Sequence, residues 1–172
     1  MTDREPIEVT NLDIYGNPTL PWSRPWELLK ASPTREVTFF LGTAQPDGLP
    51  HAAAVAALWH DGDLYFVSGP NTRKSRNIAE NPACTFASKM EGLDLILEGE
   101  AHRITDQPTL EKVAELYRKI GWPIEVKDDA FTAPYNAPSA GRPPYYLYRF
   151  TIHVAYGTAT VKPDGATRWR FA

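Results

Sequence analysis

The sequence predicts a single, mainly β domain: a small barrel of about six to seven antiparallel strands, with two or three helices between them. Three observations lead to this fold class. The 172 residues suit one domain, and 42% hydrophobic with 23% charged residues is ordinary globular usage. Short β-branched and aromatic runs alternate with turns rich in Pro and Gly. An Asp-Gly pair at residues 61–62 is the strongest short-range hairpin signal.

The charge balance and the cysteine content exclude several classes of protein. Eighteen basic and 21 acidic residues give a net charge of -3, which leaves no electrostatic footprint for general nucleic-acid binding. Cys84 is the one cysteine, so no intrachain disulfide forms. The N-terminus lacks the order of a signal peptide, and the longest apolar run, residues 52–59, is too short for a membrane span. We therefore expect a soluble, cytoplasmic protein with no nucleic-acid or membrane partner.

The first third of the chain contains an arm, a short helix and two strands. Residues 1–23 have no clean period and are expected to form an irregular arm that lies on the surface or wraps a partner subunit. A helix is expected over residues 25–30, with Ser23 as a candidate cap. Strands over residues 37–44 and 49–59 flank a Pro-Asp-Gly turn.

The middle of the chain continues this meander and then breaks it. Residues 64–68 form the third strand, joined to the second through the Asp-Gly hairpin. Thr72 is expected to cap a short helix that runs through Glu80, where an Asn-Pro pair ends it. Two further strands are expected over residues 83–89 and 93–104.

The clearest helix of the chain begins at Thr105 or Asp106 and carries an amphipathic stripe. The stripe consists of Leu110, Val113, Ala114, Tyr117 and Ile120. Residues 128–144 contain four prolines and exceed usual connection lengths, so this loop is expected to be functional or to wrap a subunit. The remaining strands are expected over residues 145–152, 154–161 and 167–171.

The strongest chemical signal is the run Thr72-Arg73-Lys74 at the expected strand-to-helix junction. A helix N-terminus has unpaired N–H groups and partial positive charge. A guanidinium, an ammonium and a hydroxyl beside them would make a phosphate site. The alternative is a solvated basic first turn of a surface helix, and the spacing alone leaves the two interpretations equally open.

Metal sites and side-chain nucleophiles have little support. His51, His60, His102 and His153 have no metal-ligand spacing, so no metal site is expected. His51 is ambiguous between a ligand contact and a structural strand histidine. Cys84 lies in an apolar strand and is expected to be a core residue. The sequence contains no G-x-S-x-G, P-loop or G-x-G-x-x-G motif, and it predicts no catalytic side chain.

The order of the motifs resembles the pyridoxamine 5'-phosphate oxidase-like flavoproteins. It runs from the Pro-Asp-Gly turn through Gly48-Leu49-Pro50-His51, the Asp-Gly hairpin and Leu64-Tyr65-Phe66-Val67-Ser68 to Thr72-Arg73-Lys74 and a helix ending Glu80-Asn81-Pro82. The match covers about residues 36–86, and the Pro-rich loop and the C-terminal end resemble small bacterial members. The resemblance implies one split β-barrel domain over residues 1–172, a homodimer, and FMN bound at the dimer interface.

The resemblance also implies roles for individual residues. The implied cofactor-binding residues are Thr72, Arg73 and Lys74 at the phosphate, the backbone of Ala53, Ala54 and Val55 beside the isoalloxazine ring, Phe66, Val67 and Ser68 along the ring and ribityl side, and Trp169 and Arg170 from the C-terminal end, from the other subunit. The candidate substrate contacts are His51, Trp122 and Tyr135. Aromatic faces of this kind can sandwich a planar ligand.

Two departures from the family bear on the substrate. True pyridoxamine phosphate oxidases have an FMN-binding arginine and a substrate-phosphate lysine where this sequence has Ala53 and Leu58. Their C-terminal Arg-Leu-His-Asp signature is also missing. We therefore expect FMN-mediated hydride transfer with a small organic substrate other than pyridoxamine phosphate.

Three alternatives remain open. The first is a reductase that uses the deazaflavin coenzyme F-420 on the same phosphate contacts. The second is a non-catalytic flavin or haem carrier, with His51 or His153 as the axial ligand of the haem. The third is a structural dimer with an empty pocket.

Overall fold

A computed structural model describes residues 4–32 and 37–172 of the chain. The strands are β1 (Glu8–Asn11), β2 (Phe39–Ala44), β3 (Pro50–Val55), β4 (Ala57–His60), β5 (Asp63–Ser68), β6 (Ala83–Met90), β7 (Leu93–Ile104), β8 (Glu125–Lys127), β9 (Ala130–Thr132), β10 (Tyr146–Ala159) and β11 (Ala166–Arg170). The helices are α1 (Ser23–Lys30), α2 (Arg73–Glu80) and α3 (Gln107–Lys119).

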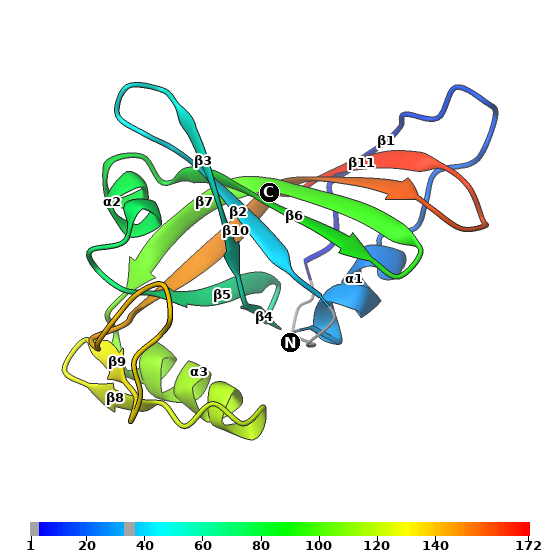
Figure 1. Cartoon of the computed structure of the whole chain (residues 1–172). Coiled ribbons are helices and arrows are strands. Elements are labelled where there is room, and N and C mark those ends of the chain that lie inside the picture. The colour runs from blue at the N-terminus through cyan, green and yellow to red at the C-terminus, as the bar shows by residue number, and fades with distance from the viewer. Residues whose placement is uncertain (1–3, 33–36) are drawn as a thin grey trace.

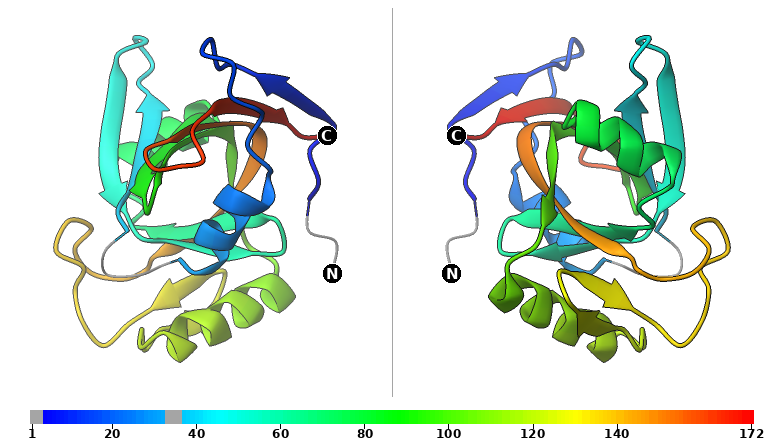
Figure 2. Two further views of the ribbon diagram at one scale, coloured as in Figure 1. Left: turned by 90° about the vertical axis from the view of Figure 1, so that its right-hand side faces the viewer. Right: turned by 90° about the vertical axis from the view of Figure 1, so that its left-hand side faces the viewer.

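Nine of these strands form one antiparallel sheet that curls into a barrel (Figure 1). The strand order is β1-β11-β10-β7-β6-β2-β3, with β5 paired to β10 and β4 paired to β5. Helix α1 lies across one end of the barrel (Figure 2), while α3 and the β8–β9 hairpin lie together outside it. The mainly β fold class and its antiparallel strands are confirmed.

The expected strand over residues 49–59 is two strands with different partners. Strand β3 pairs with β2, and β4 pairs with β5, so the chain leaves one hairpin at Val55 and enters the next at Ala57. Side chains of β3 alternate between exposed and half-buried, whereas Ala57 and Leu58 are buried. The expected single strand is wrong for a physical reason. One continuous apolar run contributes a strand to each of two hairpins, and only the change of partner strand, from β2 to β5, separates β3 from β4.

The N-terminal arm is more ordered than expected, because β1 pairs with β11. Glu8 accepts hydrogen bonds from Arg168 and Arg170, each at 3.1 Å, and these cross-strand charge pairs hold the arm on the C-terminal strand of the same chain. The cap of α1 also differs: Trp22 occupies that position, and the expected Ser23 is the first helical residue.

Two further corrections concern the C-terminal half. The expected loop over residues 128–144 begins with β9, which forms a hairpin with β8. The strands expected over 145–152 and 154–161 are the single strand β10, whose register against β7 shifts between Ile152 and Val154. A β-bulge of this kind admits one extra residue without ending the strand.

The interior is divided into two hydrophobic clusters. The first fills the barrel and contains the fully buried rings of Phe66, Phe86, Phe150 and Trp169. The second joins α3 to the outer side of the barrel. It contains four members of the expected α3 stripe, whereas the fifth, Ile120, is 43% exposed just beyond the helix. No helix in the two described segments is long and apolar enough to cross a membrane.

The expected caps of α2 and α3 are confirmed. The Thr72 hydroxyl accepts from the Ser75 amide, and the Asp106 carboxylate accepts from the Thr109 amide. Each cap satisfies one of the free amides of a first helical turn. The cap of α2 matters most here, because it fixes the direction in which the chain leaves β5.

Gly99 lies on β7 opposite Ile152 of β10, beside the bulge. An added Cβ would lie 2.0 Å from the carbonyl oxygen of Thr151, so Gly99→Ala must displace the backbone beside the bulge. We expect this substitution to lower the free energy of unfolding by about 1–3 kcal/mol. Urea unfolding followed by circular dichroism measures the change, and Thr158→Ala, at an exposed position of β10, is the control. Equal midpoints for the two variants would contradict the prediction.

Candidate functional site

A cavity of about 500 Å³, here called the junction cavity, lies where the barrel meets the α3 cluster. Its volume is in the usual range for small-ligand sites. Its walls come from the β3–β4 junction, the end of β5, the first turn of α2, the segment after α3 and the Pro-rich loop. The structure brings together seven of the expected site residues here: Ala54, Val55, Val67, Ser68, Lys74, Trp122 and Tyr135.

The first turn of α2 is shaped by the Thr72 hydroxyl. Its oxygen lies 2.8 Å from Ser68 Oγ, 3.0 Å from the carbonyl oxygen of Gly69, and 3.0 Å from Ser75 Oγ, and it accepts from the Ser75 amide at 3.3 Å. These contacts use the hydrogen-bonding capacity of the hydroxyl. Thr72 therefore fixes the turn and does not line the junction cavity.

Lys74 contributes a largely buried side chain to the cavity wall, and its ammonium is not among the fully buried unpaired atoms. Only 9% of the residue is exposed, and burial lowers the pKa of its ammonium below the usual lysine value. Within the described residues, the ammonium has no hydrogen-bond or ion-pair partner, and it is the one lysine or arginine that lines this cavity. A buried charge without a partner is costly, so an anionic ligand would remove an existing penalty.

The backbone beside Lys74 adds to the positive character of this wall. The amides of Thr72, Ser75 and Arg76 are paired, whereas those of Arg73 and Lys74 donate to no acceptor within the described residues. The Arg73 guanidinium is turned elsewhere, because this exposed side chain donates to Gln45 Oε1 in the β2–β3 turn. The three residues of the expected phosphate cradle are therefore placed differently: Thr72 caps the helix, Arg73 bonds to the β2–β3 turn, and Lys74 lines the junction cavity.

Five other expected site residues lie away from the junction cavity. Phe66 and Trp169 are fully buried in the barrel, where Trp169 packs edge-on against Trp22 with ring centroids 5.5 Å apart. These side chains fill the core and do not line the junction cavity. Ala53 and His51 lie on β3 opposite Leu41 and Thr43, and exposed Arg170 pairs with Glu8. None of the four histidines lines the cavity.

Several cavity residues were not expected from the sequence. They are Ala56, Gly121, Pro123, Ile124, Ala137, Pro138, Ser139, Ala140 and Tyr145. The unusual length of the Pro-rich loop was the one signal that pointed to this region. Trp122 belongs to a rigid wall, since its ring stacks on Tyr117 at 5.3 Å and the Tyr117 hydroxyl donates to the carbonyl oxygen of Tyr65 at 3.1 Å.

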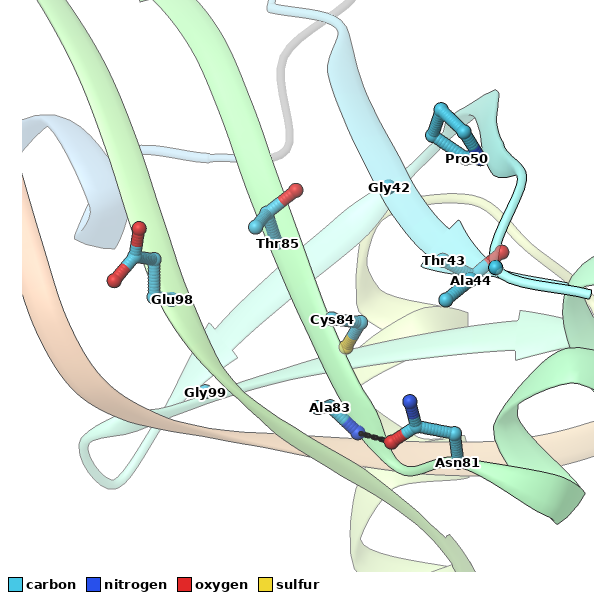
Figure 3. A pocket seen from close by; sticks show the side chains of 11 residues that line it. Gly42, Thr43, Ala44, Pro50, Asn81, Ala83, Cys84, Thr85, Glu98 and Gly99 are labelled. Carbon is cyan, nitrogen blue, oxygen red and sulfur yellow. Dashed lines mark hydrogen bonds between the residues drawn. The ribbon is translucent and has the colours of Figure 1, made fainter. Parts of the chain in front are cut away.

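A second cavity, of about 440 Å³, is lined by residues of β2, β6 and β7 and of the turns beside them (Figure 3). Small side chains and glycines line most of it, and the Asn81 side chain accepts from the Ala83 amide at 3.0 Å. Cys84 also lies here, but burial raises the pKa of its thiol to about 12, so the thiol is protonated and inert at neutral pH. No lysine or arginine is among the described residues that line it. The junction cavity is therefore the stronger candidate for a charged ligand.

Comparison with known proteins identifies the family. The family model described as Pyridoxamine 5'-phosphate oxidase matches residues 26–159, which is most of the chain. The protein belongs to this family. No curated protein matches the sequence. The resemblance found in the motif order is thereby confirmed, and with it the split-barrel fold.

Solved structures share this fold at low sequence identity. An FMN-binding protein related to pyridoxamine 5'-phosphate oxidase, from Nostoc punctiforme, is 15% identical, with a TM-score of 0.56 over 86% of this chain and 88% of that chain. A FAD-binding protein from Mesorhizobium loti is 18% identical, with a TM-score of 0.57 over 87% and 94%. An F420 reductase is 22% identical, with a TM-score of 0.52 over 75% and 93%. At these identities the likeness concerns the fold alone.

The buried charge of Lys74 predicts a stability effect in the ligand-free protein. Because burial lowers the folded-state pKa, the charged lysine opposes folding fully below that lowered pKa, and the cost disappears as pH rises toward the ordinary lysine value. Lys74→Met should therefore raise the melting temperature at about pH 7 and raise it less at about pH 10. The control is Lys112→Met on the exposed side of α3. A melting temperature at neutral pH no higher than that of the unmodified protein would contradict this prediction.

Proposed function

We propose that this protein is an FMN-dependent oxidoreductase that holds the cofactor phosphate against Lys74 and the first turn of α2. The observation that carries the proposal is the unpartnered ammonium of the largely buried residue Lys74, which lines the junction cavity beside two unpaired backbone amides. A phosphate would supply the missing counter-charge and accept from both amides. Membership of the pyridoxamine 5'-phosphate oxidase family supports a flavin-type cofactor at this place.

The chain contributes orientation and exclusion of water, while the bound flavin would supply the hydride chemistry. Strand β3 ends the strand order, so its free edge can accept a ring laid alongside it. Ala54 and Val55 are small enough to let a planar group approach the backbone. Trp122 and Tyr135 offer aromatic faces to the same cavity. No side chain is needed as nucleophile or general base.

The distribution of charge supports a small, planar substrate without a phosphate. Leu58, which stands where the family's substrate-phosphate lysine is expected, is buried in the α3 cluster at 6% exposure. Ala53, at the position of the family's FMN-binding arginine, adds no cation either. Once the cofactor phosphate occupies Lys74, no other basic side chain among the described residues lines the cavity to hold an anionic substrate. Pyridoxamine phosphate is therefore a poor fit.

The deazaflavin coenzyme F-420 is the second candidate, because its phosphate would use the same ammonium and amides. The fold shared with an F420 reductase is the observation in its favour. Haem is a weaker candidate, since neither His51 nor His153 lines the junction cavity.

The phosphate assignment is tested by comparing Lys74→Met with Arg73→Met. A charge-assisted contact contributes about 1.5–3 kcal/mol, so Lys74→Met should weaken FMN binding by about 10- to 150-fold. Arg73→Met should weaken it much less, because Gln45 holds the guanidinium outside the cavity wall. Fluorescence titration of the purified protein with FMN, and in parallel with F-420, measures both variants.

Each result has a clear meaning. Unchanged FMN affinity in Lys74→Met would refute the assignment, provided that circular dichroism confirms the fold. An equal loss in Arg73→Met would restore the guanidinium as a direct phosphate ligand. Preferential uptake of F-420 by the unmodified protein would support the phosphate site and would show that its cofactor is F-420 and not FMN.

The functional unit in this proposal is a homodimer built on the outer face of the β3-β2-β6-β7 sheet. The register places Ala54, Phe40, Ala87 and Ile96 in one row across these strands. Phe40 is 51% and Ile96 is 47% exposed, and such an apolar sheet face is typical of a subunit interface. Ala54 also lines the junction cavity, so a second copy on this face would close the cavity from outside.

Ile96→Glu tests the dimer, because it places an unpaired charge at the middle of this face. We expect light scattering at micromolar concentration to give a dimer mass for the unmodified protein and a monomer mass for the variant. Glu111→Lys, on the exposed side of α3, should remain dimeric. A monomeric unmodified protein, or a dimeric Ile96→Glu, would refute this interface.

A further inference from the structure

Residues 135–141, here called the cavity loop, are held by a single phenol. The hydroxyl of Tyr145 accepts from the Ala137 amide at 2.8 Å and donates to the carbonyl oxygen of Gly141 at 2.8 Å, with the carbonyl oxygen of Tyr135 at 3.2 Å as a second acceptor. One oxygen atom thus gathers backbone groups from the start, the middle and the end of the loop.

Tyr145 is itself firmly anchored. The residue is 4% exposed, its ring belongs to the α3 cluster, and its backbone exchanges two hydrogen bonds of 2.8 Å with Phe131 on β9. The phenol therefore reaches the cavity loop from a fixed position in the core. Within the loop, the Ala137 and Gly141 backbones also bond to each other at 2.9 Å.

The far side of the cavity loop rests against Gly69, in the turn that connects β5 to α2. An added Cβ at Gly69 would lie 3.0 Å from the carbonyl oxygen and 3.1 Å from the Cβ of Ala140. The absence of a side chain at Gly69 lets the loop approach the turn that leads to Lys74. The loop therefore extends from the α3 cluster to the α2 turn, and five of its residues line the junction cavity: Tyr135, Ala137, Pro138, Ser139 and Ala140.

We propose that the cavity loop is a lid on the junction cavity and that Tyr145 is the positioning residue that keeps it closed. Opening the loop breaks the contacts to one phenol, the packing on Gly69 and the packing of Ala137 and Ala140 on the α3 cluster, while the barrel and α3 stay as they are. Local opening of this kind is expected where few interactions fasten a segment. The lid would then set the rate at which a ligand enters and leaves. The identity of that ligand as FMN rests on the proposed function; the lid itself does not.

Tyr145→Phe tests the lid because it removes the hydroxyl and keeps the ring. In the ligand-free protein, we expect hydrogen–deuterium exchange of peptides covering residues 135–141 to accelerate about three- to tenfold. The rate at which acetic anhydride modifies Lys74, followed by mass spectrometry, should rise by a similar factor because the open lid exposes the ammonium. With FMN bound, the dissociation rate should increase as well.

Tyr146→Phe is the matched control. The guanidinium carbon of Arg103 lies 3.5 Å from the centroid of the Tyr146 ring. The Tyr146 hydroxyl makes no hydrogen bond within the described residues. It should leave exchange of the cavity loop and modification of Lys74 unchanged. Gly69→Ala is a second route to the open state, because its methyl group would push Ala140 away from the α2 turn without removing a hydrogen bond.

The outcomes separate the lid from the cofactor. Unchanged exchange of residues 135–141 in both Tyr145→Phe and Gly69→Ala would overturn the inference, whatever the cofactor is. Faster exchange with unchanged modification of Lys74 would also overturn it, because the loop would then move without uncovering the cavity. Faster exchange and modification in a protein that takes up neither FMN nor F-420 would support the lid and refute the proposed function.

Discussion

The pairing of β10 organises the whole molecule. One edge of this strand bonds to β7 along its length, and the other edge bonds first to β5 and then to β11. The change of partner coincides with the bulge between Ile152 and Val154, opposite Gly99. Pairing with β5 closes the barrel, and pairing with β11 extends the sheet beyond it (Figure 1). The end of β5, the turn of α2 and the wall of the junction cavity take their positions from this one strand.

The junction cavity lies between two hydrophobic clusters, and its composition follows from that position. Each cluster supplies apolar walls, while the first turn of α2 supplies Lys74, the one basic side chain among the described residues that line the cavity. An interior cation without a partner opposes folding, so Lys74 is hard to explain by stability alone. Sites that bind ligands often retain such unfavourable features, because binding relieves them. In the proposed function, the same residue would link a stability cost in the ligand-free protein to the binding of an anion.

Features of the fold that depend on neighbouring residues could be predicted from the sequence. Pairings between strands far apart in the chain could not. Some features depend only on residues a few positions apart, so they can be recognised directly in the sequence. They are the Asp-Gly hairpin, the Thr72 and Asp106 caps and the α3 stripe. The division of residues 49–59 at Ala56 depends on which strands lie on either side. The pairing of β1 with β11 joins segments nearly a whole chain apart. No local period carries that information.

The candidate site likewise contains residues that could be predicted from the sequence and residues that could not. Lys74 stood out because a basic residue in a first helical turn calls for an explanation, and the family resemblance drew attention to Ala54, Val55, Val67 and Ser68. Tyr145 gave no signal, because its importance comes from the loop folded around its hydroxyl. Trp169 lies in the barrel core, a placement that its position beside arginines near a chain end did not indicate.

The two ends of the strand order β1-β11-β10-β7-β6-β2-β3 differ in chemistry, and this difference has a practical consequence. At one edge, β1 covers β11 through the ion pairs of Glu8. At the other, β3 has the sequence Pro-His-Ala-Ala-Ala-Val, without a charged residue that would discourage another strand from pairing with it. Aggregation during expression or storage should therefore begin at β3, beside the junction cavity.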